Sequence, residues 1–276
     1  MRKKYPVVLS IAGSDCSGGA GIQADLKTIS ALGAYAATAI TAITVQNTQG
    51  VRTVESVPAT IVGAQVAAVM DDLRPDAIKI GMLTDVDVVR TLRSTLTAYP
   101  PCPVVLDPVM VSTSGRRLLA EEAVEALVDE LFPLCTLVTP NLAEAAVLTG
   151  QPVGDTATMK QAARRLLGLG CKAVLLKGGH LAGQTATDVL DTGTEVHLLD
   201  AAHIESRNTH GTGCTLSSAI ATFIALGKPL PEAVAEAKNF VHTAIEAGRD
   251  VQAGEGNGPL NHLFAPQRMH ILEEKV

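Results

Sequence analysis

Short runs of apolar, β-branched residues alternate with longer helical patterns along most of the chain. We expect strands at residues 7–12, 39–46, 77–80, 104–107, 134–139 and 173–177. Helical patterns lie between them, at residues 20–32, 59–73, 86–98, 120–131, 144–148 and 159–169. Repeated βα units of this size are typical of a largely parallel sheet with helices on both faces, which is a three-layer α/β/α fold.

The last third of the chain departs from this repeat. Residues 186–190 and 195–199 predict a hairpin, and helices follow from Gly213 and from Pro231. No Gly/Ser-rich or Pro-rich linker and no internal repeat interrupts the chain, so we expect residues 1–276 to form one domain. Ligands bind beyond the carboxyl ends of the strands in open α/β sheets, so the functional motifs should lie where strands end.

The composition excludes several classes of function. A net charge of −6, 3% aromatic residues and no Trp leave neither a basic surface nor a stacking surface for nucleic acid. No apolar run is long enough to span a membrane, and the stretch at 7–12 has no cleavage-like ending typical of a signal peptide. The five cysteines form no Cys-x-x-Cys pair, which indicates reduced thiols in a cytoplasmic protein.

The most informative motif is Asn-Thr-His-Gly-Thr-Gly-Cys-Thr at residues 208–215. Gly211 and Gly213 stand just before an apolar helix, where unpaired backbone N–H groups and the helix dipole favour a bound anion. Cys214 is a thiol at a position where the helix N-terminus favours the thiolate, so it is a candidate base. The motif indicates phosphoryl transfer, and the alternative is a glycine-capped helix with an inert buried thiol.

A glycine-rich turn, residues 12–21, follows the first predicted strand and contains Gly13. Its spacing matches neither the Rossmann fingerprint nor the P-loop, and a simple strand–helix turn is the alternative. Asp25 follows one turn into the next helix, either as a ligand group or as a solvated or capping carboxylate.

Gln46 closes the second predicted strand. A side-chain amide both donates and accepts hydrogen bonds, so at a strand end it can pair with the edge of a nitrogen heterocycle. The alternative is a loop amide that faces solvent. Met82 and Val109 follow later strands, where they are either core residues or apolar contacts to a ring.

Oxygen-bearing side chains gather at later strand ends, namely Asp107, Asn141 and Glu144. Mg²⁺ with a bound phosphate needs such ligands, although Asn141 and Glu144 also fit a helix-capping box. Lys177 ends a buried strand, and its charge requires a partner such as a nucleotide phosphate or the carboxylate of Glu144. His180 is interpreted as a loop residue, and the histidine spacing is not typical of a zinc site.

Together these segments resemble the hydroxymethylpyrimidine/phosphomethylpyrimidine kinases of thiamine biosynthesis, a branch of the ribokinase-like superfamily. The resemblance extends from Val7 to about Pro259 and rests on residues 11–27, 45–50, 79–82, 139–144, 177–180 and 208–217. It implies an ATP- and Mg²⁺-dependent kinase. Such an enzyme phosphorylates the hydroxymethyl group of 4-amino-5-hydroxymethyl-2-methylpyrimidine and then adds a second phosphate to the monophosphate.

The resemblance also implies roles for individual residues. The pyrimidine site would contain Gly13, Asp25, Gln46, Met82 and Val109. The anion hole would be formed by Gly211, Thr212 and Gly213, with Cys214 as the catalytic base. The nucleotide side would contain Asp107, Asn141, Lys177 and Lys238, with Glu144 and Asp107 toward the metal. Most of the superfamily has an aspartate at the base position, and a cysteine there fits this branch and its pyridoxal-kinase relatives.

Three alternatives remain open from the residues. A pyridoxine or pyridoxal kinase shares the fold, the cysteine and the chemistry. A nucleotide-binding regulator would bind ATP without transferring phosphate. A sugar kinase is disfavoured because the chain has no room for a lid of strands before Val7. The resemblance further implies a homodimer, in which residues 264–276 are either a tail or a dimer contact.

Overall fold

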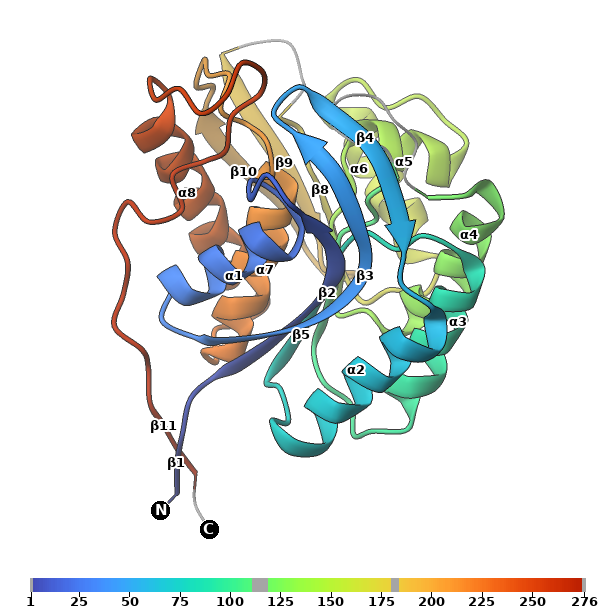
Figure 1. Ribbon diagram of the computed structural model, residues 1–276. Coiled ribbons are helices and arrows are strands. Elements are labelled where there is room, and N and C mark those ends of the chain that lie inside the picture. The colour runs from blue at the N-terminus through green and yellow to red at the C-terminus, as the bar shows by residue number, and fades with distance from the viewer. Residues whose placement is uncertain (1, 111–118, 180–183, 275–276) are drawn as a thin grey trace.

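A computed structural model describes residues 2–110, 119–179 and 184–274. A nine-stranded sheet runs through the molecule in the order β10-β9-β8-β7-β6-β5-β2-β3-β4 (Figure 1). Its parallel part contains β2 (Val7–Asp15), β3 (Tyr35–Asn47), β5 (Ala77–Ile80), β6 (Val104–Leu106), β7 (Leu137–Val138) and β8 (Val174–Leu176). Antiparallel strands complete both edges, namely β4 (Gly50–Ser56), β9 (Thr185–Asp191) and β10 (Val196–Ala202).

Helices cover both faces of the sheet (Figure 1). One face carries α1 (Gly21–Ala31), α7 (Thr212–Ala225) and α8 (Leu230–Gly248). The other carries α2 (Ala59–Asp72), α3 (Val86–Thr97), α4 (Glu121–Ala126), α5 (Leu142–Thr149) and α6 (Thr156–Leu167). The predicted three-layer α/β fold with a largely parallel sheet is therefore confirmed.

Side chains point alternately to the two faces of the sheet along each strand, and this divides the core into two layers. In β2, Leu9 and Ile11 belong to the cluster beneath α2 and α3, whereas Val8 belongs to the cluster beneath α1 and α7. Successive side chains of a strand point to opposite faces, so a strand covered on both sides needs apolar residues at every position. The short apolar runs in the sequence follow from this requirement.

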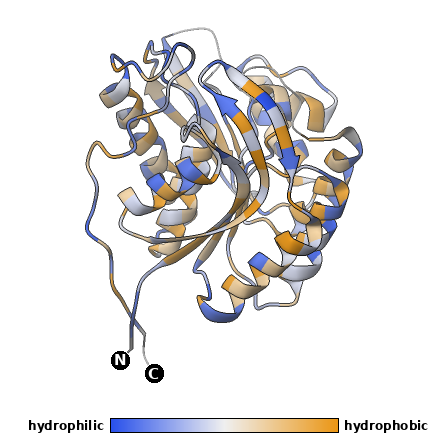
Figure 2. Ribbon diagram, viewed as in Figure 1, coloured by the Kyte–Doolittle hydropathy of each residue, from blue (hydrophilic) through white to orange (hydrophobic). Residues whose placement is uncertain are grey.

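Two parts of the fold differ from the sequence prediction. Strand β4 was not expected, because it lies at the sheet edge and is mostly polar, with only Val51 and Val54 as large apolar residues instead of an apolar run. In the hairpin that it forms with β3, hydrophobic and hydrophilic residues alternate (Figure 2), and Ile43 and Val45 are exposed. The predicted strand at 134–139 is reduced to Leu137–Val138, because a helical turn occupies Phe132–Leu134.

The two ends of the described chain pair with each other outside the main sheet. Strand β1 (Arg2–Lys4) is antiparallel to β11 (Leu272–Glu274). Before β11, the segment runs along the end of α1, where the Gln267 N–H donates to the Ala31 carbonyl at 2.7 Å. Within the described residues, none of the helices combines the length and the apolar character that a membrane crossing requires.

A buried histidine ties the segment after α8 to the first turn of α7. His262 is 3% exposed, and its Nε2 lies 2.9 Å from Oγ1 of Thr215. That hydroxyl donates to the carbonyl of Gly211 at 2.9 Å, so His262 Nε2–H donates to Thr215. Burial lowers the pKa of His262 to about 4, and the nearby charge of Lys27 adds to the effect.

We expect the protein to lose stability between pH 7.5 and pH 5 because of His262. Its pKa is lower in the folded chain, about 4, than its ordinary value of 6.5, so the unfolded chain binds the proton first as the pH falls. This linkage alone costs about 2 kcal/mol of unfolding free energy at pH 5, measurable by urea unfolding. In His262→Gln, the loss of unfolding free energy between pH 7.5 and pH 5 should be smaller by that amount. An unchanged loss in the variant would show that the low pKa of His262 is not its cause.

Candidate functional site

The start of α7 lies against the glycine-rich turn that follows β2. Gly211 is the N-cap of α7 and has φ +85°, a conformation that glycine adopts readily. A Cβ at this position would come within 1.9 Å of the Gly19 carbonyl oxygen, so only glycine permits this contact. The first backbone N–H groups of α7 therefore face the carboxyl edge of the sheet, where a helix N-terminus favours an anion.

An ion pair lies next to this helix start. Asp107, just after β6, contacts Nζ of Lys177, just after β8, at 2.7 Å. A Cβ on Gly213 would lie 3.1 Å from Asp107 Oδ2 and 3.3 Å from Lys177 Nζ, so α7 begins beside both charges. Burial acts to lower the pKa of Lys177, but Asp107 and Glu144 raise it above its ordinary value, and Lys177 stays charged.

Asn141 and Glu144 form the capping box of α5. The Asn141 side chain accepts the Glu144 N–H at 2.9 Å, and Glu144 Oε2 accepts the Asn141 N–H at 2.8 Å. The capping interpretation is therefore confirmed for both residues. Glu144 is 5% exposed, and burial raises its pKa to about 7, with Lys177 lowering it and Asp107 raising it. Both carboxylates thus lie close to the Lys177 ammonium.

Beneath the helix start, Lys79 is completely buried in β5. Its Nζ contacts the two carboxylate oxygens of Asp25 at 2.8 and 2.9 Å. Asp25 also accepts hydrogen bonds from the hydroxyls of Ser10, at 2.5 Å, and Ser218, at 2.7 Å. Interpreting Asp25 as a solvated or capping carboxylate is wrong, because it is 0% exposed and the N-cap of α1 receives no side-chain hydrogen bond. Its carboxylate is needed inside the protein to pair with Lys79.

The Cys214 thiol is protonated in this site. Burial raises its pKa to about 11, and the charge of Lys79 lowers it while Asp25 and Asp107 raise it further. The role of Cys214 as a base stays a prediction, and burial acts against the thiolate that the helix N-terminus favours. The effect of the helix N-terminus is smaller than the combined cost of burial and two nearby carboxylates.

On the other side of the helix start, Gln46 contacts the segment that precedes α7. Its side-chain nitrogen lies 2.9 Å from Nε2 of His210, and this histidine nitrogen lies 2.9 Å from Oδ2 of Asp15. Burial raises the pKa of Asp15, but hydrogen bonds from His210 and Ser17 hold it well below its usual range. Gln46 is half-buried and not a free loop amide.

Gly13, in the last part of β2, and Met82, just after β5, contact each other. A Cβ on Gly13 would lie 2.4 Å from the terminal methyl of Met82, which is 8% exposed. The Met82 carbonyl accepts a hydrogen bond from Thr41 at 2.6 Å. Val109 is half-buried and follows Asp107 in a tight turn. Contact of these three residues with a bound ring stays a prediction.

Lys238 holds the turn after Lys177 in place. Its Nζ contacts Asp188 Oδ2 at 2.7 Å and the Ala186 carbonyl at 2.9 Å. The other oxygen of Asp188 accepts the Gly178 N–H at 2.8 Å. The Lys238 ammonium is thus paired with protein groups, and a direct contact with a nucleotide stays a prediction.

Four residues that the sequence analysis gave no role contribute to this arrangement, namely Asp15, Lys79, Asp188 and His210. A signal existed for Lys79, because a charge within an apolar strand requires a partner, as argued for Lys177. The other three are recognised only by their contacts across the fold. His180 lies outside the described residues.

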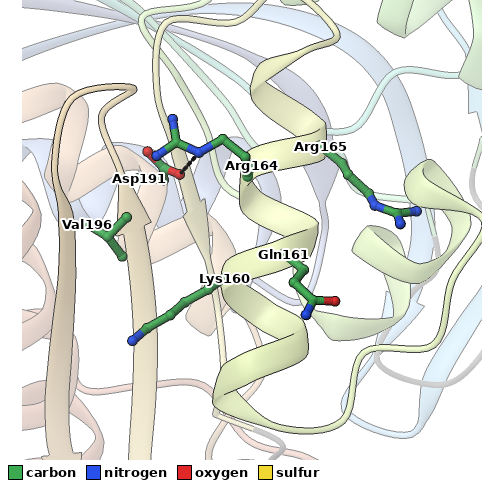
Figure 3. Close-up of a pocket in the computed structure, with 6 residues that line it drawn as sticks. All are labelled: Lys160, Gln161, Arg164, Arg165, Asp191 and Val196. Carbon is green, nitrogen blue, oxygen red and sulfur yellow. Dashed lines mark ion pairs between the residues drawn. The ribbon is translucent and has the colours of Figure 1, made fainter.

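A surface cavity of about 490 Å³ lies elsewhere, between α6 and the β9–β10 turn (Figure 3). Asp191 pairs with Val174 at the amino end of β8, opposite the end that carries Lys177. Arg164 points toward Asp191, at 3.2 Å, whereas Lys160 and Arg165 point away from each other (Figure 3). The charged groups around this cavity do not converge.

Among the described residues, no group of three or more His, Cys, Asp and Glu side chains is placed to hold a metal.

Residues 15–261 match the family model described as phosphomethylpyrimidine kinase. The chain belongs to this family. It is 54% identical to a hydroxymethylpyrimidine/phosphomethylpyrimidine kinase of Rhizobium meliloti, over 93% of this chain and 97% of that protein.

Solved structures of related kinases share the fold of this chain. A phosphomethylpyrimidine kinase from Clostridium difficile matches with a TM-score of 0.77 and 44% identity, over 87% of this chain and 99% of that one. A pyridoxal kinase from Staphylococcus aureus, solved with AMP-PCP and pyridoxal, matches with a TM-score of 0.87 and 32% identity. This match covers 98% of the present chain and 100% of the Staphylococcus aureus chain. The ribokinase-like assignment from the sequence is therefore confirmed.

The buried ion pair beneath the site predicts a stability effect. Lys79→Met should cost about 3–5 kcal/mol of unfolding free energy, because it leaves the Asp25 carboxylate buried without its counter-charge. The double variant Lys79→Met/Asp25→Asn removes both charges and should recover part of this loss in urea unfolding. A cost below about 1 kcal/mol for Lys79→Met, or no recovery in the double variant, would show that the pair does not stabilise the fold.

Proposed function

We propose that this chain is an ATP-dependent kinase of thiamine biosynthesis. It phosphorylates the hydroxymethyl group of 4-amino-5-hydroxymethyl-2-methylpyrimidine and then phosphorylates the monophosphate. The observation that carries the proposal is the contact of Gly213, in the first turn of α7, with the Asp107–Lys177 pair. This contact brings a helix N-terminus, a half-buried cation and a carboxylate to one point, and phosphoryl transfer requires this combination.

The transferring phosphoryl group would lie at the start of α7. Phosphoryl transfer depends mainly on positioning and on neutralising charge on the phosphate oxygens. The Thr212 N–H donates to the Thr209 carbonyl at 3.2 Å, so the backbone N–H groups of Gly211, Gly213 and Cys214 would bind the phosphoryl group, and they would not have to reorganise during the reaction. Lys177 would offset charge on the ATP phosphates, since its ammonium stays protonated there.

Asp107 and Glu144 fit a Mg²⁺ ion bound together with ATP. Mg²⁺ is commonly held by one or two carboxylates together with substrate phosphates and water. The raised pKa of Glu144 reflects a buried acid beside a second carboxylate, an arrangement that a nearby cation would relieve. When bound, the metal supplies further neutralisation of the phosphate charge.

The acceptor alcohol would bind on the Gln46 side of α7. The Gln46 amide offers a donor and an acceptor to the ring nitrogen and the amino group of the pyrimidine. Gly13, Met82 and Val109 would bound the ring. Asp25 contributes from beneath, through Lys79, because its carboxylate does not leave the protein interior.

Cys214 is the proposed base for the alcohol. Its thiol must first release its own proton to solvent, which the half-buried side chain reaches; Lys79 promotes this loss and the two neighbouring carboxylates oppose it. The thiolate then accepts the hydroxyl proton as the oxygen attacks the γ-phosphoryl group. The second step has a phosphate monoester as acceptor, which is largely ionised near neutral pH. It therefore needs no such base.

The proposal is tested by ADP formation and by chromatographic separation of the mono- and diphosphate products. The wild-type protein should form ADP only when the pyrimidine alcohol or its monophosphate is present. Cys214→Ala should lower kcat for the first phosphorylation by about 100-fold or more, since general-base catalysis is worth roughly 10²–10⁴-fold. The second phosphorylation should lose less than about 10-fold, below that range.

Two outcomes would count against this assignment. ATP binding without substrate-dependent ADP formation would identify a nucleotide-binding regulator instead of a kinase. Equal losses in both steps, in a Cys214→Ala protein with unchanged thermal unfolding, would exclude Cys214 as the base of the first step. His242→Phe is a matched control for handling and folding, because this exposed side chain lies on α8 and contacts the Ala202 carbonyl.

A pyridoxal kinase is the second candidate, favoured by the structural likeness to the Staphylococcus aureus enzyme. It would use the same helix start and the same cysteine. A homodimer and a cytoplasmic location stay predictions. The exposed Ile43 and Val45 on the β3–β4 hairpin are compatible with a dimer contact.

A further inference from the structure

The carboxylate of Asp15 accepts hydrogen bonds on both of its oxygens. Oδ1 accepts from the backbone and hydroxyl of Ser17, at 2.8 and 2.7 Å. Oδ2 accepts from the backbone N–H groups of Gly19 and Ala20, at 3.1 and 2.8 Å, and lies 2.9 Å from His210 Nε2. A carboxylate with this many donors is ionised, and it can only accept.

This arrangement fixes the proton on His210. A nitrogen lone pair held 2.9 Å from an ionised carboxylate would be repelled, so Nε2 must carry the proton and donate to Asp15. A half-turn of the ring would replace Nε2 by a carbon at Asp15 and lose this hydrogen bond, so the observed ring orientation is favoured. The backbone N–H of His210 is also held, by the Gly258 carbonyl at 3.0 Å.

The proton on His210 in turn fixes the amide of Gln46. The same Nε2 lies 2.9 Å from the side-chain nitrogen of Gln46, and two N–H groups facing each other there would repel, so the amide is assigned in the reversed orientation. The Gln46 oxygen must therefore face His210, since a half-turn of the amide exchanges its oxygen and nitrogen. The amide NH₂ then faces away from His210, toward the proposed ring site. The oxygen keeps one lone pair for a second donor.

We propose that His210, held by Asp15, is the positioning residue that makes Gln46 select a 4-aminopyrimidine over its 4-oxo analogue. This inference rests on the proposed function. An aminopyrimidine edge offers a ring-nitrogen acceptor and an amino donor, which match the fixed NH₂ and oxygen of Gln46. A 4-oxo ring offers a ring N–H donor and a carbonyl acceptor, the reverse pattern. A glutamine without this contact would rotate its side-chain amide by a half-turn to match the 4-oxo ring, and His210 prevents this rotation.

Selectivity between the two pyrimidine alcohols tests the proposal. The ratio of kcat/KM for the 4-amino compound to kcat/KM for the 4-oxo compound should exceed about 100 in the wild type, since a mismatched site leaves buried polar groups unpaired. His210→Phe keeps an aromatic ring and removes the N–H, so the ratio should fall at least 10-fold. In a Gln46→Met background, His210→Phe should change the ratio no further. His242→Phe, on the surface of α8, should leave the ratio unchanged.

A merely structural role for His210 predicts a different result. In that case His210→Phe would lower kcat/KM for both compounds by the same factor, and the ratio would stay constant. A constant ratio, or a further change in the Gln46→Met background, would overturn the proposal.

The tautomer of His210 can be measured without any substrate. Long-range ¹H–¹⁵N correlation spectra of the wild-type protein should show the proton on Nε2. A proton on Nδ1 alone would overturn the proposal, whatever the kinetic results and even if His210→Phe does not fold. Failure of the wild-type protein to phosphorylate either pyrimidine, with the Nε2 proton present, would refute the proposed function and with it the selectivity claim.

Discussion

The ammonium of Lys79 has no access to water, and much of the site depends on how the protein accommodates this charge. Strand β5 supplies the lysine, α1 supplies Asp25 as its partner, and β2 and α7 supply the hydroxyls of Ser10 and Ser218. An unpaired charge in a protein interior is costly, so these four elements must keep one arrangement. The helix start that would bind phosphate belongs to one of them.

Above this pair, opposing charges meet within a small region. Lys177, Asp107 and Glu144 lie near the carboxyl ends of neighbouring strands and interact with one another, and Lys177 and Asp107 also act on Cys214. Asp107 and Glu144 raise the pKa of Lys177, whereas burial, Asp25 and Asp107 raise the pKa of the Cys214 thiol. If Cys214 is the proposed base, its activation depends on this local charge balance.

Features set by local sequence could be predicted from the residues alone. The strands and helices follow from apolar periodicity, and the Asn141–Glu144 capping box follows from spacing along one helix. The polar ends of β2, β5, β6 and β8 also gather at one edge, as expected for parallel strands. Strand β4 was missed because an edge strand needs no continuous apolar run.

Contacts between distant segments could not be predicted in the same way. Asp25 and Lys79 are 54 residues apart, and Gln46 and His210 are 164 residues apart. No local pattern shows that these side chains meet. The raised pKa of the Cys214 thiol could not be predicted either, because a helix N-terminus is visible in the sequence whereas burial and two nearby carboxylates are not. The roles of residues that depend on nearby charges can therefore be assigned only from the folded structure.

Steady-state kinetics on two alcohols would decide what the site accepts. With saturating MgATP, kcat/KM should be measured for 4-amino-5-hydroxymethyl-2-methylpyrimidine and for pyridoxal with one enzyme preparation. If the ring edge presented to Gln46 determines the substrate, the value for the pyrimidine should be at least about 10-fold higher, which corresponds to about one well-formed hydrogen bond. An equal or higher value for pyridoxal would contradict the assignment.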